Sequence, residues 1–538
     1  MGYTSTSRRL LTIVFFNRLV VTLIVITQLI TTQVLNAVDV SEKTPKTIET
    51  VIGYVNKYCA ACHKVPPPNL MPRKDWAPAI DVMVDMANKE VGGDFIPEDI
   101  VKDIKAYYRG SSPEQLPRLP HHKDTEHSNK FIAKEIATKA KTPNIININS
   151  VFLSDRNSAE FLICDGDKNQ IILLSNTKGT WNERVLADIK APSHTQVIDY
   201  DNDGDNDIIV AALGFLPPSE ALAGKVFLLR QSTTGEFSKE LILEGVGRIT
   251  DAQALDVDND NDLDILVAIF GGGKVGELIW LENVGKPGLI KRSLIKVSGA
   301  LNISPVDLNN DGLIDIVSLI AQEHEMVVAL INQGKGEFKA VSLIEAPHPM
   351  FGFTGLKLVD LDQDDDVDIL FTNGDSHDLQ MDPKPYHGIQ WLENQGNLNF
   401  QFHDIARFYG AVTAVAGDMD SDGDLDIVAS SWNNYWDDDK RQSLIWFENN
   451  GKQKFTRHNI NNSPQSIVTL ALKDVSGNGG LDIIAGVLRM DLLIKNMFAP
   501  PTTKSDIDKT LQSPVETRVI LMENNILQSN KTKKASLK

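Results

Sequence analysis

The sequence predicts two domains of different classes: a small all-α domain over residues 45–118 and an all-β, seven-bladed propeller over residues 131–527. Two observations predict them. Short segments with helical apolar spacing come first, and a repeat with a period of about 50 to 60 residues follows, which is typical of propeller blades. Residues 119–130 read as a linker and residues 528–538 as a disordered tail.

Length and composition exclude several classes of protein. The chain has 538 residues, too many for one ordinary domain, and its 42% apolar and 23% charged residues are those of a soluble globular protein. The net charge of −19 and the lack of a basic groove argue against nucleic acid as a partner. Much of the acidity lies in repeated aspartate clusters that resemble metal-binding loops.

The N-terminal segment, residues 1–37, reads as a signal peptide. The basic pair Arg8 and Arg9 precedes an apolar run over residues 19–30, and Ala37 closes a possible cleavage site. This run is too short to span a bilayer, although a longer stretch that includes earlier residues leaves an uncleaved anchor as the alternative. We therefore expect an exported protein of the bacterial periplasm or cell surface, at the membrane only if the segment stays uncleaved.

One pentapeptide in the first domain has a pattern that is typical of a redox cofactor site. Cys59 and Cys62 are separated by two alanines, and His63 follows directly, which gives the C-x-x-C-H attachment pattern of a c-type haem. In this pattern the two thiols form thioethers with the porphyrin, and the imidazole becomes the proximal iron ligand. The third cysteine, Cys164, lies in an apolar segment typical of a buried strand. We expect one covalent haem c.

The segments around this motif resemble class I cytochromes c. Residues 47–58 lead into the motif as a first helix would, and residues 76–88 have helical apolar spacing. The pattern F-x-P-E-D-I-x-x-x-I-x-x-Y-Y at residues 95–108 resembles the C-terminal helix of that family. The resemblance implies that this last helix packs across the first one.

The sixth iron ligand is open at this stage. The spacing from Trp76 to Met83 resembles small bacterial cytochrome c domains in which such a methionine is the distal ligand, so the resemblance implies Met83. Met71 and Met86 are the alternatives, since methionine also fills cores. The histidines of the following linker are further candidates: His121, His122 and His127.

An aspartate loop recurs through the second domain. Carboxylates at loop positions 1, 3 and 5 direct three hard oxygens to one point, and position 9 supplies a fourth, which favours Ca²⁺. Position 6 needs a left-handed residue, and three copies place glycine there, whereas Asn261 tolerates the conformation and Asp365 is less suited to it. The five intact copies are Asp199/Asp201/Asp203/Asp207, Asp256/Asp258/Asp260/Asp264, Asp307/Asn309/Asp311/Asp315, Asp360/Asp362/Asp364/Asp368 and Asp418/Asp420/Asp422/Asp426.

Each loop is followed by strand-like segments, four per repeat. The second strand ends in a shared phrase such as Trp280-Leu-Glu-Asn, and an aromatic or apolar residue opens the third. A degenerate loop at 474–482 and a stretch at 151–160 that has lost its acidic residues extend the count to seven. The strand that begins at Phe131 is expected to complete the last blade, because an unclosed propeller would expose long strand edges. Six or eight blades are the alternatives.

These repeats resemble the FG-GAP/VCBS family, whose loops bind Ca²⁺ in propellers like those of integrin α chains. The resemblance implies several structural calcium ions and a propeller used as a binding scaffold. An EF-hand is the rival interpretation, but it requires flanking helices and a glutamate at position 12.

Long connections on the face opposite the aspartate loops are candidate ligand sites. Trp432, Tyr435 and Trp436 could stack on a sugar or a partner protein, or could plug the propeller channel. The loop histidines could act as acid–base groups or metal ligands, or could have no such role: His348, His377 and His387.

Three interpretations of the function follow. The first is electron transfer by an exported haem protein, with a calcium-stabilised propeller that binds a redox partner, another protein or a glycan. The alternative is a haem-fused propeller dehydrogenase that oxidises a sugar or alcohol and passes electrons to the haem. No catalytic residue is identified, and an adhesin-like or polysaccharide-active module is a third interpretation.

Overall fold

The computed structural model describes residues 46–121, 130–153, 158–216, 219–271, 275–286, 288–322, 324–376, 382–489 and 516–527. The expected signal peptide and C-terminal tail lie outside these ranges. Within them, no helix is long and apolar enough to cross a membrane.

Three helices form the N-terminal unit: α2 (Ile48–Tyr58), α3 (Trp76–Val91) and α4 (Glu98–Ser111). Two single 3₁₀ turns, η1 (Cys59–Ala61) and η2 (Pro68–Leu70), connect α2 to α3. Thr47 caps α2, because its hydroxyl accepts the Thr50 N–H, and α3 ends at Gly92 in the left-handed conformation. The three helical segments expected from apolar spacing are therefore present.

The core of this unit holds the proline-rich segment that follows the C-x-x-C-H motif. The rings of Trp76 and Tyr108 stack with centroids 4.1 Å apart, and both side chains are buried. The Trp76 indole N–H donates to the Pro68 carbonyl, and the Tyr108 hydroxyl donates to the Pro66 carbonyl, both at 2.9 Å. Helices α3 and α4 therefore fix the backbone just beyond His63.

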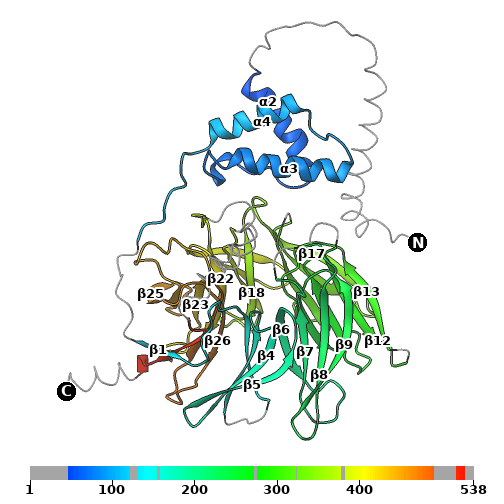
Figure 1. Ribbon diagram of the computed structural model, residues 1–538, viewed down its shortest axis with the longest axis vertical. Coiled ribbons are helices and arrows are strands. Elements are labelled where there is room, and N and C mark those ends of the chain that lie inside the picture. Colours follow the sequence, from blue (N-terminus) through cyan, green and yellow to red (C-terminus); the bar gives the residue numbers. More distant parts are fainter. Residues whose placement is uncertain are drawn as a thin grey trace, which may run out of the picture.

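The rest of the described chain forms seven four-stranded antiparallel sheets, the blades of a propeller (Figure 1). Six blades join four consecutive strands each. Their bounds are β2 (Ile145–Val151), β3 (Ala159–Asp165), β4 (Gln170–Thr177) and β5 (Thr180–Asp188); β6 (Pro192–Ile198), β7 (Asp207–Ala212), β8 (Gly224–Gln231) and β9 (Phe237–Val246); β10 (Ile249–Leu255), β11 (Asp264–Ile269), β12 (Glu277–Asn283) and β13 (Leu289–Ile295); β14 (Ser304–Val306), β15 (Asp315–Ile320), β16 (Met326–Asn332) and β17 (Phe338–Glu345); β18 (Phe353–Val359), β19 (Asp368–Asn373), β20 (Gly388–Asn394) and β21 (Phe400–Arg407); and β22 (Ala411–Gly417), β23 (Asp426–Ser431), β24 (Leu444–Glu448) and β25 (Thr456–Asn461).

The seventh blade closes the ring with a strand from the start of the domain. It consists of β26 (Ile467–Lys473), β27 (Asp482–Val487) and β28 (Val519–Asn524), and its outer strand is β1 (Phe131–Glu135). Phe131 lies opposite Asn524 in the β1–β28 register. The prediction of seven blades closed by the Phe131 strand is confirmed.

A buried arginine ties the last blade to the first. The Arg518 side chain is completely buried, with Nη1 2.5 Å from Asp165 and Nη2 2.6 Å from Glu183. Its Nε also donates to the Thr138 carbonyl at 2.6 Å. Every edge of the guanidinium is therefore bonded across the closure of the ring, as a buried cation requires.

Apolar side chains of neighbouring sheets form the core between blades. Cys164, expected as a small core residue, is fully buried on β3 and packs with residues of the second blade such as Ile208 and Val210. Such clusters recur around the ring, so each blade is held by its two neighbours.

Candidate functional site

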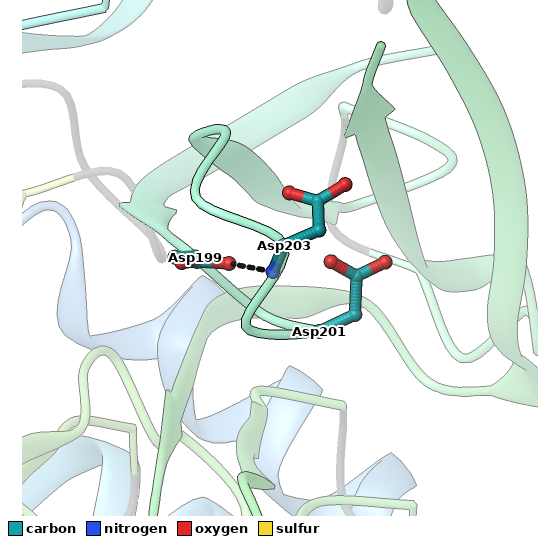
Figure 2. Close-up of side chains that lie close together, drawn as sticks. All are labelled: Asp199, Asp201 and Asp203. Atoms are coloured by element: carbon teal, nitrogen blue, oxygen red, sulfur yellow. Dashed lines mark hydrogen bonds between the residues drawn. The ribbon is translucent and has the colours of Figure 1, made fainter. Parts of the chain in front are cut away.

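The aspartate loops connect the first and second strands of their blades and fold alike. In the first loop the Asp199 carboxylate accepts the N–H groups of Asp203 and Gly204, both at 3.1 Å. Figure 2 shows this loop, with the Asp201 and Asp203 carboxylates extending from it in the same direction. The four other intact copies repeat both bonds, at 2.8–3.2 Å. Strands flank every copy, which argues against an EF-hand.

Position 6 of each loop is left-handed, as the repeat predicted. The φ angle there is 92° at Gly204, and the non-glycine residues Asn261 and Asp365 adopt 72° and 74°. The fourth loop therefore keeps the common conformation despite its aspartate at this position.

Four of the loops gather three carboxylates each, with ligand atoms within 4.8 Å of one another. The first two loops do so with positions 1, 3 and 5, and the fourth and fifth with positions 1, 3 and 9. Such groups of acidic oxygens could bind calcium. The third loop has Asn309 at position 3 and is not among these groups in the described residues. The groups are Asp199/Asp201/Asp203, Asp256/Asp258/Asp260, Asp360/Asp362/Asp368 and Asp418/Asp420/Asp426.

The groups hold part of the expected ligand set, in which positions 1, 3, 5 and 9 of every loop direct oxygens to one point, and the remaining positions stay predictions. Among the described residues, the position 5 carboxylates of the last three intact loops lie outside the groups: Asp311, Asp364 and Asp422. Each accepts through Oδ1 the N–H two residues further on, at 2.9–3.0 Å, which holds the carboxylate against its own loop. Asp203 and Asp260 make the same bond within their groups, so a ligand role for the other three stays a prediction.

The position 3 carboxylates divide the loops into two kinds. Asp258, Asp362 and Asp420 each bury an Oδ1 that has no hydrogen-bond partner. Burial and then the neighbouring carboxylates raise the pKa of Asp420 to about 6 and raise the pKa values of the other two. In the first loop, by contrast, Arg230 lies 2.5 Å from the Asp201 carboxylate. Loops two, four and five thus hold uncompensated negative charge that a cation would stabilise.

The position 9 aspartates also anchor the sheets. Asp264 accepts the Val257 N–H at 3.1 Å and the Asn283 N–H at 2.7 Å, and burial raises its pKa to about 6. Asp207, Asp315, Asp368 and Asp426 make the same pair of bonds at their own positions. A carboxylate oxygen has two lone pairs, so these bonds leave room for a further ligand role.

The C-x-x-C-H motif lies at the end of α2. Cys59 is half-buried against the helical core, and burial raises the pKa of its thiol to about 11, whereas Cys62 is exposed. His63 Nδ1 lies 2.8 Å from the Lys64 carbonyl oxygen. If Nδ1 donates this bond, the lone pair of the imidazole is on Nε2.

The three candidate methionines have different surroundings. Met83 is half-buried and packs against the same apolar cluster as Cys59. Met71 is completely buried in that cluster, and Met86 is 64% exposed on α3. Of the linker histidines, His121 lies 2.6 Å from the Asp438 carboxylate, and His122 and His127 are outside the described residues.

The helical unit lies over one face of the propeller (Figure 1). The aspartate loops belong to the opposite face, because each joins the first strand of its blade to the second. The contacts come from connections after the second and fourth strands, which lie at the other end of each antiparallel blade. Lys64 Nζ donates to the Ala346 carbonyl at 2.9 Å and lies 3.1 Å from Glu345. Met350 and Tyr386 pack against the helical core.

The loop between β23 and β24 of the sixth blade, which carries Trp432, Tyr435 and Trp436, contacts residues that follow the helical unit. Arg118 lies 4.2 Å over the Tyr435 ring, and the Leu119 N–H donates to the Tyr409 hydroxyl at 2.6 Å. The Trp432 indole N–H donates to the Gly374 carbonyl at 3.0 Å. This loop therefore holds the linker, a role that neither sequence interpretation of its aromatic residues included.

A cavity of about 190 Å³ lies between the motif and the propeller. His348 lines it, is 7% exposed and has a buried Nδ1 without a hydrogen-bond partner. Burial lowers the pKa of His348 to about 4. His387 is also buried, and its Nδ1 accepts the N–H groups of Lys384 and Gly410. His377 is outside the described residues. The cavity is lined by Cys62, His63, Lys64, His324, Met326, Glu345, Ala346, His348 and Pro349.

A second cavity, of about 870 Å³, lies among the inner strands of the first three blades. His194 Nδ1 lies 2.8 Å from the Asp251 carboxylate there, and Asp251 also accepts the Ile303 N–H at 3.0 Å. Burial raises the pKa of Asp251, but the neighbouring His194 and the hydrogen bonds that Asp251 accepts lower it, and the net shift is downward. No sequence motif marks this pair, because its members come from different blades.

Comparison with known proteins identifies the repeats. Residues 199–267 and 307–371 match the FG-GAP-like repeat family, and these two stretches contain four of the five aspartate loops. No curated protein matches the chain. The all-β domain is therefore a seven-bladed propeller, and two stretches of it match the FG-GAP-like repeat family.

Proposed function

We propose that this chain is an exported electron-transfer protein with one covalent haem c on its helical unit and a calcium-stabilised propeller that binds a redox partner, another protein or a glycan. The observation that carries the proposal is the C-x-x-C-H motif at the end of a capped helix, with Nδ1 of the His63 imidazole 2.8 Å from a backbone carbonyl oxygen. A bound haem would supply one-electron exchange.

The donor set fits this cofactor. Cys59 and Cys62 would hold the porphyrin covalently, and His63 would hold the iron through Nε2, because Nδ1 is within hydrogen-bond distance of Lys64. Met83 is the proposed distal ligand, since its half-buried side chain shares an apolar cluster with Cys59. Met71 serves as core packing in this proposal, and Met86 is too exposed.

Calcium ions are proposed for the aspartate loops, with the orphaned oxygens of Asp258, Asp362 and Asp420 as support. Export to the periplasm or cell surface is proposed from the N-terminal segment and from the haem pattern, since a c-type haem is normally attached after translocation. Ion binding there would be structural, because the loops join strands within a blade.

The haem proposal is tested by expression in a host with a haem-attachment system, followed by denaturing electrophoresis with a haem stain. The wild-type chain should retain haem after denaturation, and Cys59→Ser with Cys62→Ser should lose it. Cys164→Ser, at a buried thiol outside the motif, is the matched control and should keep haem. A wild-type chain that emerges without covalent haem would overturn the proposal.

One observation favours the dehydrogenase alternative: the cavity beside Cys62 and His63 is completed by propeller residues, including His348. An oxidised, haem-loaded protein mixed anaerobically with sugars or alcohols distinguishes the two functions. Haem reduction by substrate alone supports the dehydrogenase, and reduction only by a protein or chemical donor supports the electron carrier.

A further inference from the structure

The cavity between the helical unit and the fourth blade brings together side chains from three separate segments. Two belong to the propeller: residues 324–326 enter β16, and residues 345–349 leave β17. They run side by side, because Met326 lies opposite Glu345 in the register and the Ala346 N–H donates to the Glu325 carbonyl at 2.8 Å. The backbone thus fixes His324, Met326 and His348 around one space.

His348 is the clearest sign that this space takes a ligand. Its side chain is more than nine-tenths buried, yet Nδ1 has no hydrogen-bond partner. A buried polar atom without a partner is destabilising. The rings of Tyr386 and Phe351 meet the His348 ring edge-on, and His348 also lines the cavity.

The donor atoms around the cavity are soft. Two imidazoles and one thioether line its propeller side, and the one carboxylate, Glu345, lies 3.1 Å from Lys64. Thioether and imidazole ligands select copper, and Cu(I) in particular, whereas Ca²⁺ and Mg²⁺ require several oxygens. The volume of about 190 Å³ suits an ion with a few waters and is below the roughly 300–1,000 Å³ of small-molecule pockets.

We propose that His324, Met326 and His348 form a copper site, preferring Cu(I), at the interface between the helical unit and the propeller. The site uses side chains of the propeller alone and does not depend on haem attachment. It lies beside Cys62 and His63, so a metal held there would be next to the proposed haem. The protein would then separate hard-cation sites on one face from a soft-cation site on the other.

The test is competition for Cu(I) between the full-length, calcium-loaded protein and a chromogenic Cu(I) chelator. The chain with Cys59→Ser and Cys62→Ser serves as the background, so that the thiols of the motif cannot bind the metal. We expect one Cu(I) per chain. His348→Phe and Met326→Leu should each weaken binding by at least about tenfold, because loss of even an outer-shell partner costs 10–100-fold.

Matched controls separate ligand loss from misfolding. His403→Phe removes an imidazole that stacks on Trp391, far along the chain from the cavity, and Met522→Leu exchanges a buried thioether in the seventh blade. Both should bind Cu(I) as the background does. Copper binding that is absent in the background, or that survives both His348→Phe and Met326→Leu, would overturn the proposal. An affinity for Zn²⁺ equal to that for Cu(I) would overturn its choice of metal.

Discussion

The two faces of the propeller differ in how their chemistry arises. One face carries the aspartate loops, which repeat nearly the same residues and the same hydrogen bonds from backbone N–H groups to the position 1 carboxylate in five blades. The other face carries connections without a common pattern, and these contact the helical unit, hold the linker and surround the soft-donor cavity. Repetition thus builds oxygen sites locally, whereas the unique face acquires its chemistry from segments far apart in sequence.

The largest expected effect on the free energy of unfolding comes from breaking the buried ion pair that joins the last blade to the first. Arg518→Met leaves the buried Asp165 without its cation, and breaking a buried ion pair costs about 3–5 kcal/mol. Urea unfolding of the propeller measures this loss. The control, Arg230→Met, breaks ion pairs of half-exposed side chains and should cost no more than about 1 kcal/mol. Equal losses in the two variants would show that Arg518 does not hold the ring closed.

Calcium should stabilise the folded protein through the face that carries the aspartate loops. At free Ca²⁺ about 100-fold above its dissociation constant, each site occupied only in the folded state adds about 2.7 kcal/mol. Melting temperature with and without a chelator measures this. Asp420→Asn should reduce the calcium-dependent gain and, in chelator, should stabilise the protein slightly, because the charge of this partly buried carboxylate is unfavourable without a cation.

The loops themselves supply the control for this prediction. Asp201→Asn should change the calcium-dependent gain less, because Arg230 already compensates this carboxylate, and the third loop has Asn309 at the same position. A larger loss of calcium response from Asp201→Asn than from Asp420→Asn would contradict the division of the loops into two kinds.

The stability of the propeller should fall in acid because of Asp251, which contacts His194 at the cavity among the inner strands. The pKa of Asp251 is lowered below 3.8 in the folded protein, so this carboxylate contributes stability that is present above pH about 4 and is lost as the pH falls below it. Asp251→Asn should cost about 1.5–3 kcal/mol at pH 7, as loss of charged hydrogen bonds does. Unfolding curves from pH 3 to 7 should then be flatter below pH 4 for the variant, and a parallel shift at all pH values would contradict the assignment.

The smallest effect is expected at the contact between the two domains. Lys64 and Glu345 are both about half-exposed, so Lys64→Met should change the stability of the propeller by less than about 1 kcal/mol. Denaturation followed by tryptophan fluorescence checks this, with Lys225→Met, in the exposed pair with Glu244, as the control. A loss of several kcal/mol would mean that the helical unit stabilises the propeller far more than its surface contacts indicate.

The sequence determined the features that depend on neighbours along the chain. The repeat period, the aspartate spacing and the Phe131 strand were enough to predict seven closed blades, and position 6 is left-handed even at Asp365. The helices around Cys59 and Cys62 could also be predicted, because apolar spacing acts within a few residues. These are local hydrogen bonds and local periodicities, which a linear pattern records directly.

The tertiary structure alone decided which residues meet across the fold. Arg230 reaches Asp201 from β8, so the first loop differs from the others although its own sequence is intact. His348 lies beside Cys62 only because Lys64, Met350 and Tyr386 seat the helical unit on the fourth and fifth blades. Such contacts depend on the packing of whole domains, which sums many weak long-range interactions and leaves no periodic signal in the sequence.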